Sequence, residues 1–162
     1  MRWGRESASG PSEDDARARV RWAAGPEDVS GAIAVREEVF CREQGVPRSE
    51  ELDGLDDRAL HLVALDPDGE VIGTLRLLIS GSEAKIGRVA VEREWRRQGI
   101  ASLMLQSALR EARERGCLSA RLAAQTRATR VYERAGFSIE SEPFEEAGIA
   151  HVWMGRELAR AG

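Results

Sequence analysis

The chain has 162 residues, of which 42% are hydrophobic, and its 24 basic and 28 acidic side chains leave a net charge of −4. This length predicts one domain with its own core. The acidic balance argues against nucleic acid as a partner, because a phosphate backbone needs a basic face. No apolar run approaches the roughly 20 residues that span a bilayer, and the N-terminus lacks the apolar core of a signal peptide. We therefore expect a cytoplasmic protein without a membrane partner.

Composition predicts where the folded domain begins, and the spacing of the cysteines predicts their chemical state. Residues 1–18 mix glycine, serine, proline and charges, which predicts a disordered tail before a single domain over residues 19–162. Cys41 and Cys117 lie far apart and show no C-x-x-C or metal-site spacing, so we expect free thiols and no metal.

The first half of the chain predicts a strand, a helix and a hairpin. Pro26 suits the first turn of a helix that runs to about Glu43. Residues 48–52 are the candidate for a short second helix. Strands are expected over residues 20–22, 60–65 and 71–79, the last two joined by a Pro/Asp/Gly turn.

The connection over residues 44–59 is long and acidic. Its carboxylates either face a cationic substrate or are simply solvated, and a solvated loop is the commoner outcome. The acids concerned are Glu50, Glu51, Asp53, Asp56 and Asp57.

The second half predicts a strand over residues 84–91, a helix over 100–113, and a strand over 119–124 parallel to the first because a helix connects them. A helix over 126–134 and strands over 137–141 and 149–154 follow. Residues 142–148 are expected to be a connection. The order predicts an α/β (α+β) fold: a mixed, twisted sheet of about seven strands with helices on both faces.

The turn between residues 91 and 100 is the strongest functional feature. A strand leads through Arg96 and Gly99 into a helix whose first N–H groups are unpaired, and such a helix N-terminus binds anions. The two arginines, Arg96 and Arg97, add charge, and Gly99 lets the backbone approach a ligand. We read this turn as a pyrophosphate cradle, although two solvated arginines beside a glycine would look the same.

Residues 96–101 (RRQGIA) resemble the Q/R-x-x-G-x-G/A motif of the GNAT superfamily of N-acetyltransferases. The preceding strand (RVAV) and residues 132–137 (YERAGF) resemble further family segments, in the same order and spacing. Residues 35–40, 43–47, 59–64 and 146–151 are most similar to the ElaA-like branch. The resemblance covers roughly residues 20–158 and implies the GNAT fold.

The resemblance implies acetyl-CoA as the acetyl donor, with no metal. Its pyrophosphate would lie on the turn and its pantetheine along the strand, where a backbone N–H would polarise the thioester. Gln125 stands where the family often has Asn and is a weaker candidate. The implied cofactor-binding residues are Val89, Ala90, Val91, Arg96, Arg97, Gln98, Gly99, Ile100, Ala101, Gln125 and Tyr132.

Tyr132 matches the family's general acid, which protonates the leaving thiolate; without the motif a core tyrosine would be the simpler reading. The sequence leaves the base open, because water can also accept the amine proton. Candidate bases are Glu38, Glu43, His61 and His151, and we favour Glu43 and His151. For binding of the acceptor we expect Arg36, Phe40 and His61.

The implied reaction is direct transfer of acetyl to a primary amine, on a small molecule or a peptide, by a monomer or homodimer. Two other functions stay open. One is an acyl-CoA-binding sensor or subunit without turnover. The other is acyl-homoserine-lactone synthesis, which the helix carrying Arg36, Phe40 and Glu43 favours and the intact pyrophosphate motif opposes.

Overall fold

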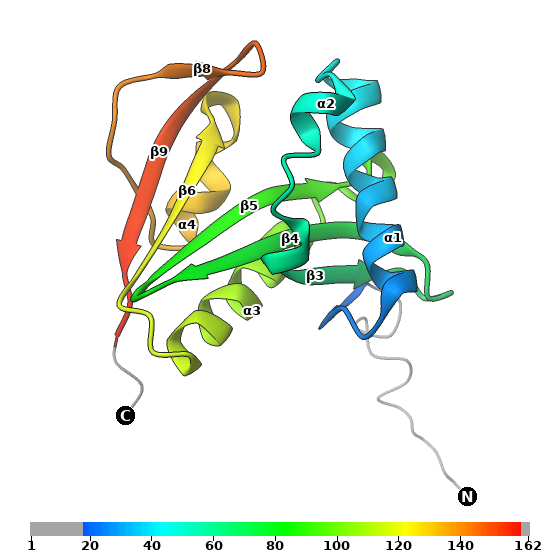
Figure 1. Ribbon diagram of the computed structural model, residues 1–162, viewed down its shortest axis with the longest axis horizontal. Helices are drawn as coiled ribbons and strands as arrows, with labels where there is room; N and C mark the ends of the chain where they lie inside the picture. Colours follow the sequence, from blue (N-terminus) through cyan, green and yellow to red (C-terminus); the bar gives the residue numbers. More distant parts are fainter. Residues whose placement is uncertain (1–17, 160–162) are drawn as a thin grey trace, which may run out of the picture.

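The computed structural model describes residues 18–159, and within them eight strands form one sheet (Figure 1). Their order is β2-β3-β4-β5-β6-β9-β7, and β8 pairs with β9. The strands are β2 (Arg19–Trp22), β3 (Leu60–Leu65), β4 (Val71–Ser80), β5 (Glu83–Val91), β6 (Ser119–Gln125), β7 (Ser138–Ile139), β8 (Phe144–Glu146) and β9 (Ile149–Glu157). The expected tail lies outside the described residues except for Ala18, which packs into the core.

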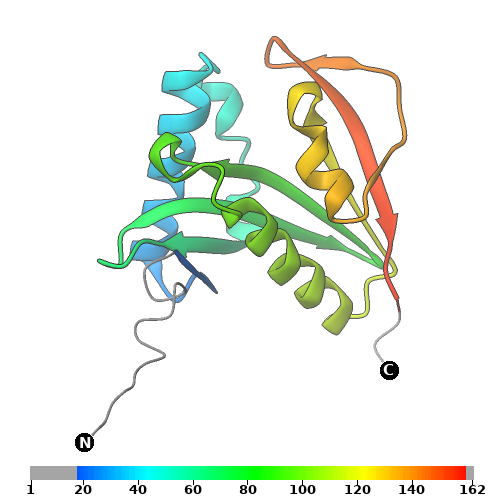
Figure 2. The ribbon, with the colours of Figure 1, turned by 180° about the vertical axis from the view of Figure 1, so that it is seen from behind.

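Helices cover both faces of the sheet, as expected. The α-helices are α1 (Pro26–Arg36), α2 (Arg48–Glu51), α3 (Ile100–Glu114) and α4 (Thr129–Arg134). A π-helix, η2 (Glu37–Glu43), continues α1, and short 3₁₀ turns are η3 (Asp56–Arg58), η4 (Arg93–Trp95) and η5 (Thr126–Ala128). Helices α1 and α2 lie on the face toward the viewer in Figure 1, and α3 and α4 lie on the face seen in Figure 2.

The main core lies between the sheet and the helices α3 and α4. Met104 and Leu105 of α3 are fully buried there, together with Leu75 and Leu77 of β4. On the opposite face Ala32 of α1 packs against β3 in a smaller cluster. Gly31 lets α1 approach β4 closely, because a Cβ at this position would stand 2.6 Å from a methyl group of Val71.

The expected elements are largely confirmed, with four differences. The strand expected over residues 137–141 is only the two residues of β7, and the helix expected over 126–134 begins as the 3₁₀ turn η5. The helix from Pro26 does end at Glu43, but its last seven residues are π-helical. Residues 144–146 form a strand where we expected only a connection, since Ala147 and Gly148 both adopt positive φ, 53° and 76°, in a two-residue hairpin turn. Such turns favour Asn-Gly or Asp-Gly, so an Ala-Gly pair is a weak signal in a sequence.

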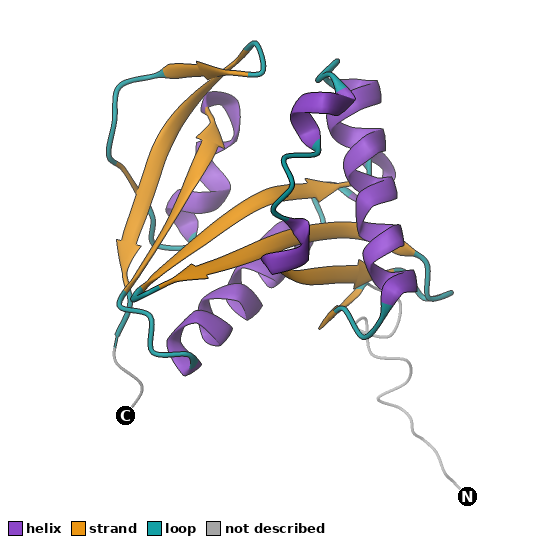
Figure 3. Ribbon diagram, in the orientation of Figure 1, coloured by secondary structure: helices purple, strands orange, loops and turns teal. Residues whose placement is uncertain are grey.

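Strands β5 and β6 are paired only at one end. They run parallel and match three residue pairs, Glu83 to Lys85 against Ser119 to Arg121. Beyond that point β5 follows β4 and β6 follows β9, so the two halves of the sheet diverge (Figures 1 and 3). We call this divergence of β5 from β6 the wedge. It depends on pairing across the sheet, so the sequence alone could not reveal it.

A bulge in β5 accompanies this divergence. Thr74 pairs with Ala90 and Arg76 with Gly87, so two residues of β5 face one residue of β4. Arg88, one of these two, has φ of 53°, a left-handed conformation that is rare for a residue other than glycine. A bulge bends its strand, and here it turns the last residues of β5 away from β6.

Candidate active site

The turn between β5 and α3 contains two residues with left-handed backbone. Gly99 is the N-cap of α3 with φ of 81°, and Arg97 before it has φ of 63°. The space where a Gly99 Cβ would stand has no heavy atom within 4 Å, so a ligand can approach the backbone there. The first N–H groups of a 15-residue helix therefore face an open position at the end of β5. This is a good fit for a pyrophosphate group.

The two arginines of the turn differ in their freedom. The Arg96 guanidinium donates to both carboxylate oxygens of Glu43, at 2.7 and 3.0 Å, and its Nε donates to the Val91 carbonyl at 2.8 Å. No carboxylate among residues 18–159 pairs with Arg97. Arg96 thus supports the turn, and Arg97 is the side chain left to meet an anion.

The ion pair changes the chemistry expected of Glu43. The hydrogen bonds from Arg96, together with the charge of Arg93, hold the pKa of the Glu43 carboxyl below its usual range. A carboxylate with a lowered pKa and both oxygens occupied is a poor proton acceptor. The geometry therefore favours a supporting role for Glu43 over the expected role of base. Glu38, another candidate base, pairs with Arg42 in the exposed part of the same helix.

The strand residues expected to bind pantetheine lie at the wedge. Ala90 is buried against Val35 and Val39, and Phe40 packs on the same cluster. Val89 and Val91 are half-buried and pack against the main core. Phe40, expected to bind the acceptor, is thus half-buried beside the β5 strand.

A side-chain bridge that the sequence did not predict spans the two halves of the sheet. Gln125, at the end of β6, donates from Nε2 to Oε1 of Gln44, which follows η2, at 2.8 Å. These residues are 81 positions apart. Gln125 therefore lies at the open end of the wedge, where a pantetheine amide would have to share or replace this hydrogen bond.

Tyr132 lies on α4 in the main core, with 8% of its surface exposed. The rings of Tyr132 and Phe137 pack edge to face, with their centroids 6.4 Å apart. Burial raises the pKa of the Tyr132 phenol to about 12, so it remains protonated at any ordinary pH. This protonated state is required of a general acid, although the raised pKa also makes it a weaker one.

His151 faces the same end of the wedge, on β9 opposite Gln125. Its Nδ1 lies 2.7 Å from the carbonyl oxygen of Ile149, which can only accept, so Nδ1 carries the proton. In the neutral ring Nε2 then bears the lone pair. Phe144 of β8 stacks on the imidazole at 6.0 Å. Of the two favoured bases, Glu43 is held in an ion pair, whereas within residues 18–159 Nε2 of His151 is in none. Nδ1 of His61 is also without a partner there, but it is buried.

Arg36 and His61 do not occupy the positions expected of acceptor-binding residues. Arg36 is 1% exposed, and its guanidinium donates two hydrogen bonds to Glu51 and two to Asp56. His61 is 6% exposed and donates from Nε2 to the Asp56 carbonyl. Contact with a substrate would require breaking these bonds, so the structure gives no support for that role.

These residues belong to an ion network that fastens the acidic connection to the sheet. Arg76 of β4 binds Asp53 and Asp56, and Arg88 at the bulge binds Glu51 and Asp53. The members are Arg36, Arg76, Arg88, Glu51, Asp53 and Asp56. Three of the five loop acids are thus neutralised by arginines and are not open to a cationic substrate. Arg88 was not predicted from the sequence. Its role depends on its left-handed backbone in a β-bulge, which no local pattern indicates.

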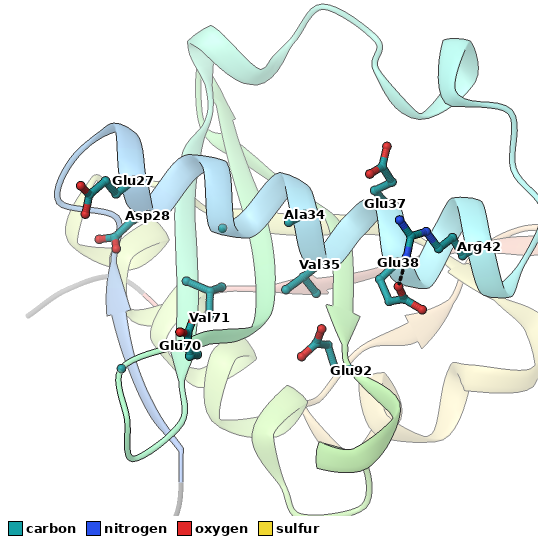
Figure 4. Close-up of a pocket in the computed structure, with 12 residues that line it drawn as sticks. Glu27, Asp28, Ala34, Val35, Glu37, Glu38, Arg42, Glu70, Val71 and Glu92 are labelled. Atoms are coloured by element: carbon teal, nitrogen blue, oxygen red, sulfur yellow. Dashed lines mark hydrogen bonds and ion pairs between the residues drawn. The ribbon is translucent and has the colours of Figure 1, made fainter.

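Carboxylates do gather elsewhere, in a groove of about 520 Å³ between α1 and the ends of β4 and β5 (Figure 4). Burial and the neighbouring carboxylates raise the pKa of the Glu92 carboxyl. Arg42 is the basic residue of the lining and pairs with Glu38. The acids that line the groove are Glu27, Asp28, Glu37, Glu38, Glu70 and Glu92. Its potential favours cations.

Within residues 18–159 no group of His, Cys, Asp and Glu is arranged to hold a metal ion, and no helix is long and apolar enough to cross a membrane. Cys41 and Cys117 are free thiols, as expected.

Comparison with known proteins gives consistent results. A family model described as an acetyltransferase (GNAT) domain matches residues 24–158. The uncharacterized N-acetyltransferase YjcF of Bacillus subtilis is 33% identical over 129 residues, 79% of this chain and 91% of that protein.

Solved structures share the fold. An acyl-CoA N-acyltransferase from Pseudomonas aeruginosa has a TM-score of 0.76 at 30% identity, covering 86% of this chain and 99% of that one. Escherichia coli ElaA has a TM-score of 0.75 at 24% identity, covering 86% and 100% of the two chains, and at this identity it supports the fold alone. The motif turn and the divided sheet agree with the family match, and the chain belongs to the GNAT acetyltransferase family.

Proposed function

We propose that this protein transfers the acetyl group of acetyl-CoA directly to a primary amine. The observation that supports this most is the wedge between β5 and β6, which ends at the Gly99 turn. A wedge of unpaired strand backbone suits an extended amide chain, and the turn suits the pyrophosphate that follows it. The donor would be held by backbone groups of β5, by the N–H groups of residues 99–101, and by Arg97.

The candidate site residues can be given roles in acetyl transfer. The amine nitrogen forms a bond to the thioester carbonyl carbon, and the carbon–sulfur bond breaks. The departing thiolate takes a proton from the Tyr132 hydroxyl, and the amine gives up its proton to Nε2 of His151 or to water. We assign the base to His151 and not to Glu43, because Glu43 is bound by Arg96 and its pKa is lowered.

Two alternatives are weighed against this function. The helix that favoured acyl-homoserine-lactone synthesis holds Arg36 and Glu43 in internal ion pairs, so that argument loses its basis. An acyl-CoA-binding sensor would need no proton donor at the position of Tyr132.

The test is release of free thiol from acetyl-CoA in the presence of a panel of primary amines and lysine peptides, with propionyl-CoA and succinyl-CoA as other donors. We expect amine-dependent thiol release with acetyl-CoA preferred, and one acetylated amine per thiol. Tight binding of acetyl-CoA by calorimetry without thiol release on any amine would favour the sensor instead.

A further inference from the structure

A second cavity lies on the opposite face from the acidic groove, between α3, the end of α4 and β9. Its volume is about 470 Å³. Four arginines and no carboxylate line it; the lining residues are Gln106, Leu109, Arg110, Arg113, Arg134, Ala135, Gly136 and Arg156. We call this cavity the arginine pocket. In a chain with a net charge of −4, it concentrates positive charge in one place.

The charge in the arginine pocket is not neutralised by the protein. Within residues 18–159, none of Arg110, Arg113, Arg134 and Arg156 lies within 4 Å of a carboxylate oxygen. Other arginines of the chain do pair, for example Arg115 with Glu111 on the same helix. Since like charges gathered in one cavity repel each other, the arginine pocket is more stable with an anion inside it.

One of these side chains is held in place, and another has a buried donor without a partner in the described chain. The Arg156 guanidinium donates from Nη1 to the Ala135 carbonyl at 2.8 Å and from Nε to the Glu157 carbonyl at 3.1 Å. Gly136 makes room for it, because a Cβ there would stand 2.8 Å from Nη1. The Nε of Arg113 is buried without a hydrogen-bond partner in the described chain. A buried donor without an acceptor is unusual and indicates that an acceptor belongs nearby.

We propose that the arginine pocket binds a small anion with two or more phosphate groups. The planar guanidinium matches the oxygens of phosphate in a two-point fashion, and several such groups together call for a multiply charged ligand. The volume lies in the range of about 300–1,000 Å³ typical of small-molecule sites. A nucleic acid would instead need basic residues spread along a face or stripe.

This site is separate from the donor's pyrophosphate turn. The turn lies at the N-terminus of α3, whereas Arg110 and Arg113 lie ten and thirteen residues further along the helix from Ile100. At a rise of 1.5 Å per residue, that separation is about 15–20 Å. One anion of pyrophosphate size cannot touch both sites.

The experiment is calorimetric titration of the full chain with inorganic tripolyphosphate. We expect saturable binding with one anion per chain at the arginine pocket. The affinity should fall at least tenfold in R110Q/R113Q and stay within twofold of wild type in Arg58→Gln. Arg58 is an exposed arginine on η3, on the other side of the sheet. Its replacement by glutamine removes the same kind of charge. Melting temperatures check that each variant is folded. Arg110→Glu, which changes one exposed side chain, serves if the double variant does not fold.

Two further measurements separate this site from other anion binding. Binding by the arginine pocket should persist in Gly99→Val, which alters only the pyrophosphate turn. Loss of tripolyphosphate binding in Gly99→Val, equal affinity in R110Q/R113Q, or no saturable binding would each overturn the proposal. Tighter binding of a short single-stranded RNA than of tripolyphosphate would also overturn it, in favour of a nucleic-acid partner.

Discussion

Glu43 and Arg96 join the end of η2 to the pyrophosphate turn through a two-point ion pair between residues 53 positions apart. Arg96 also donates to the Val91 carbonyl at the end of β5. The turn is thus held from two sides, by the strand that leads into it and by the helix that covers the other face of the sheet. Removal of Glu43 should therefore affect the donor and not the proton transfer.

We expect Glu43→Gln to weaken acetyl-CoA binding about 3- to 10-fold, because a partly exposed charge pair contributes roughly 0.5–1 kcal/mol and its loss also loosens the turn. The kcat and its pH dependence should stay within a few-fold of wild type. Glu38→Gln, which removes an exposed pair on the same helix, is the matched control. A fall in kcat of about 100-fold or more, with loss of the acidic limb of the pH profile, would restore Glu43 as the base.

Gly99→Val should weaken acetyl-CoA binding at least tenfold, or about 1.4 kcal/mol. A β-branched residue is strained at φ of 81°, and its side chain would fill the open space in front of the helix. Gly81→Val is the control, since Gly81 also has positive φ and open space but lies in the β4–β5 hairpin turn. Both variants should lose thermal stability, and only Gly99→Val should lose affinity; an equal affinity in the two would contradict the assigned site.

Tyr132→Phe should leave the fold and acetyl-CoA affinity intact and lower the single-turnover rate by roughly 10²–10⁴-fold. Because burial raises the pKa of the Tyr132 phenol to about 12, the wild-type rate should not fall through ionisation of Tyr132 below about pH 11. The measurement uses saturating acetyl-CoA and an acceptor found by screening. An unchanged single-turnover rate would mean that Tyr132 only packs the core.

Arg36→Leu should destabilise the protein by about 3–5 kcal/mol, because it leaves the buried carboxylate of Glu51 without its main partner. Chemical denaturation measures the free energy of unfolding. Arg21→Leu breaks an exposed pair with Asp28 and should cost less than about 1 kcal/mol. Similar losses in the two variants would show that the network contributes no more than a surface pair.

The same network predicts how stability depends on pH. Hydrogen bonds from Arg76 hold the pKa of Asp53 far below its usual range, and for Asp56 bonds from Arg36 and Arg76 outweigh the effect of burial and lower the pKa. Their contribution is therefore complete above the unfolded pKa of about 4 and is lost as pH falls through the lower folded values. The melting temperature should fall steeply below about pH 4, and less steeply in Asp53→Asn. Parallel curves would argue against this origin.

Local features of the sequence determined the elements and the pyrophosphate turn. The strand over residues 60–65 and the helix that begins at Ile100 agree with the pattern of apolar residues, and Gly99 stands immediately before that helix, as expected. The sequence over residues 126–134 predicted the helix that carries Tyr132, which the structure buries in the main core. These features depend on residues close together in the chain, so a sequence pattern records them directly.

The tertiary structure decided which side chains are free to act. Glu43 was a candidate base in the sequence, and its ion pair with Arg96 makes it a poor one. Three of the acids of residues 44–59 are neutralised by arginines from α1, β4 and β5, which the sequence of this connection does not show. The Gln44–Gln125 bridge and the wedge depend in the same way on contacts across the sheet. A charge's pKa and availability are set by the groups that folding brings near it, often tens of residues away in the chain, and no local pattern encodes those neighbours.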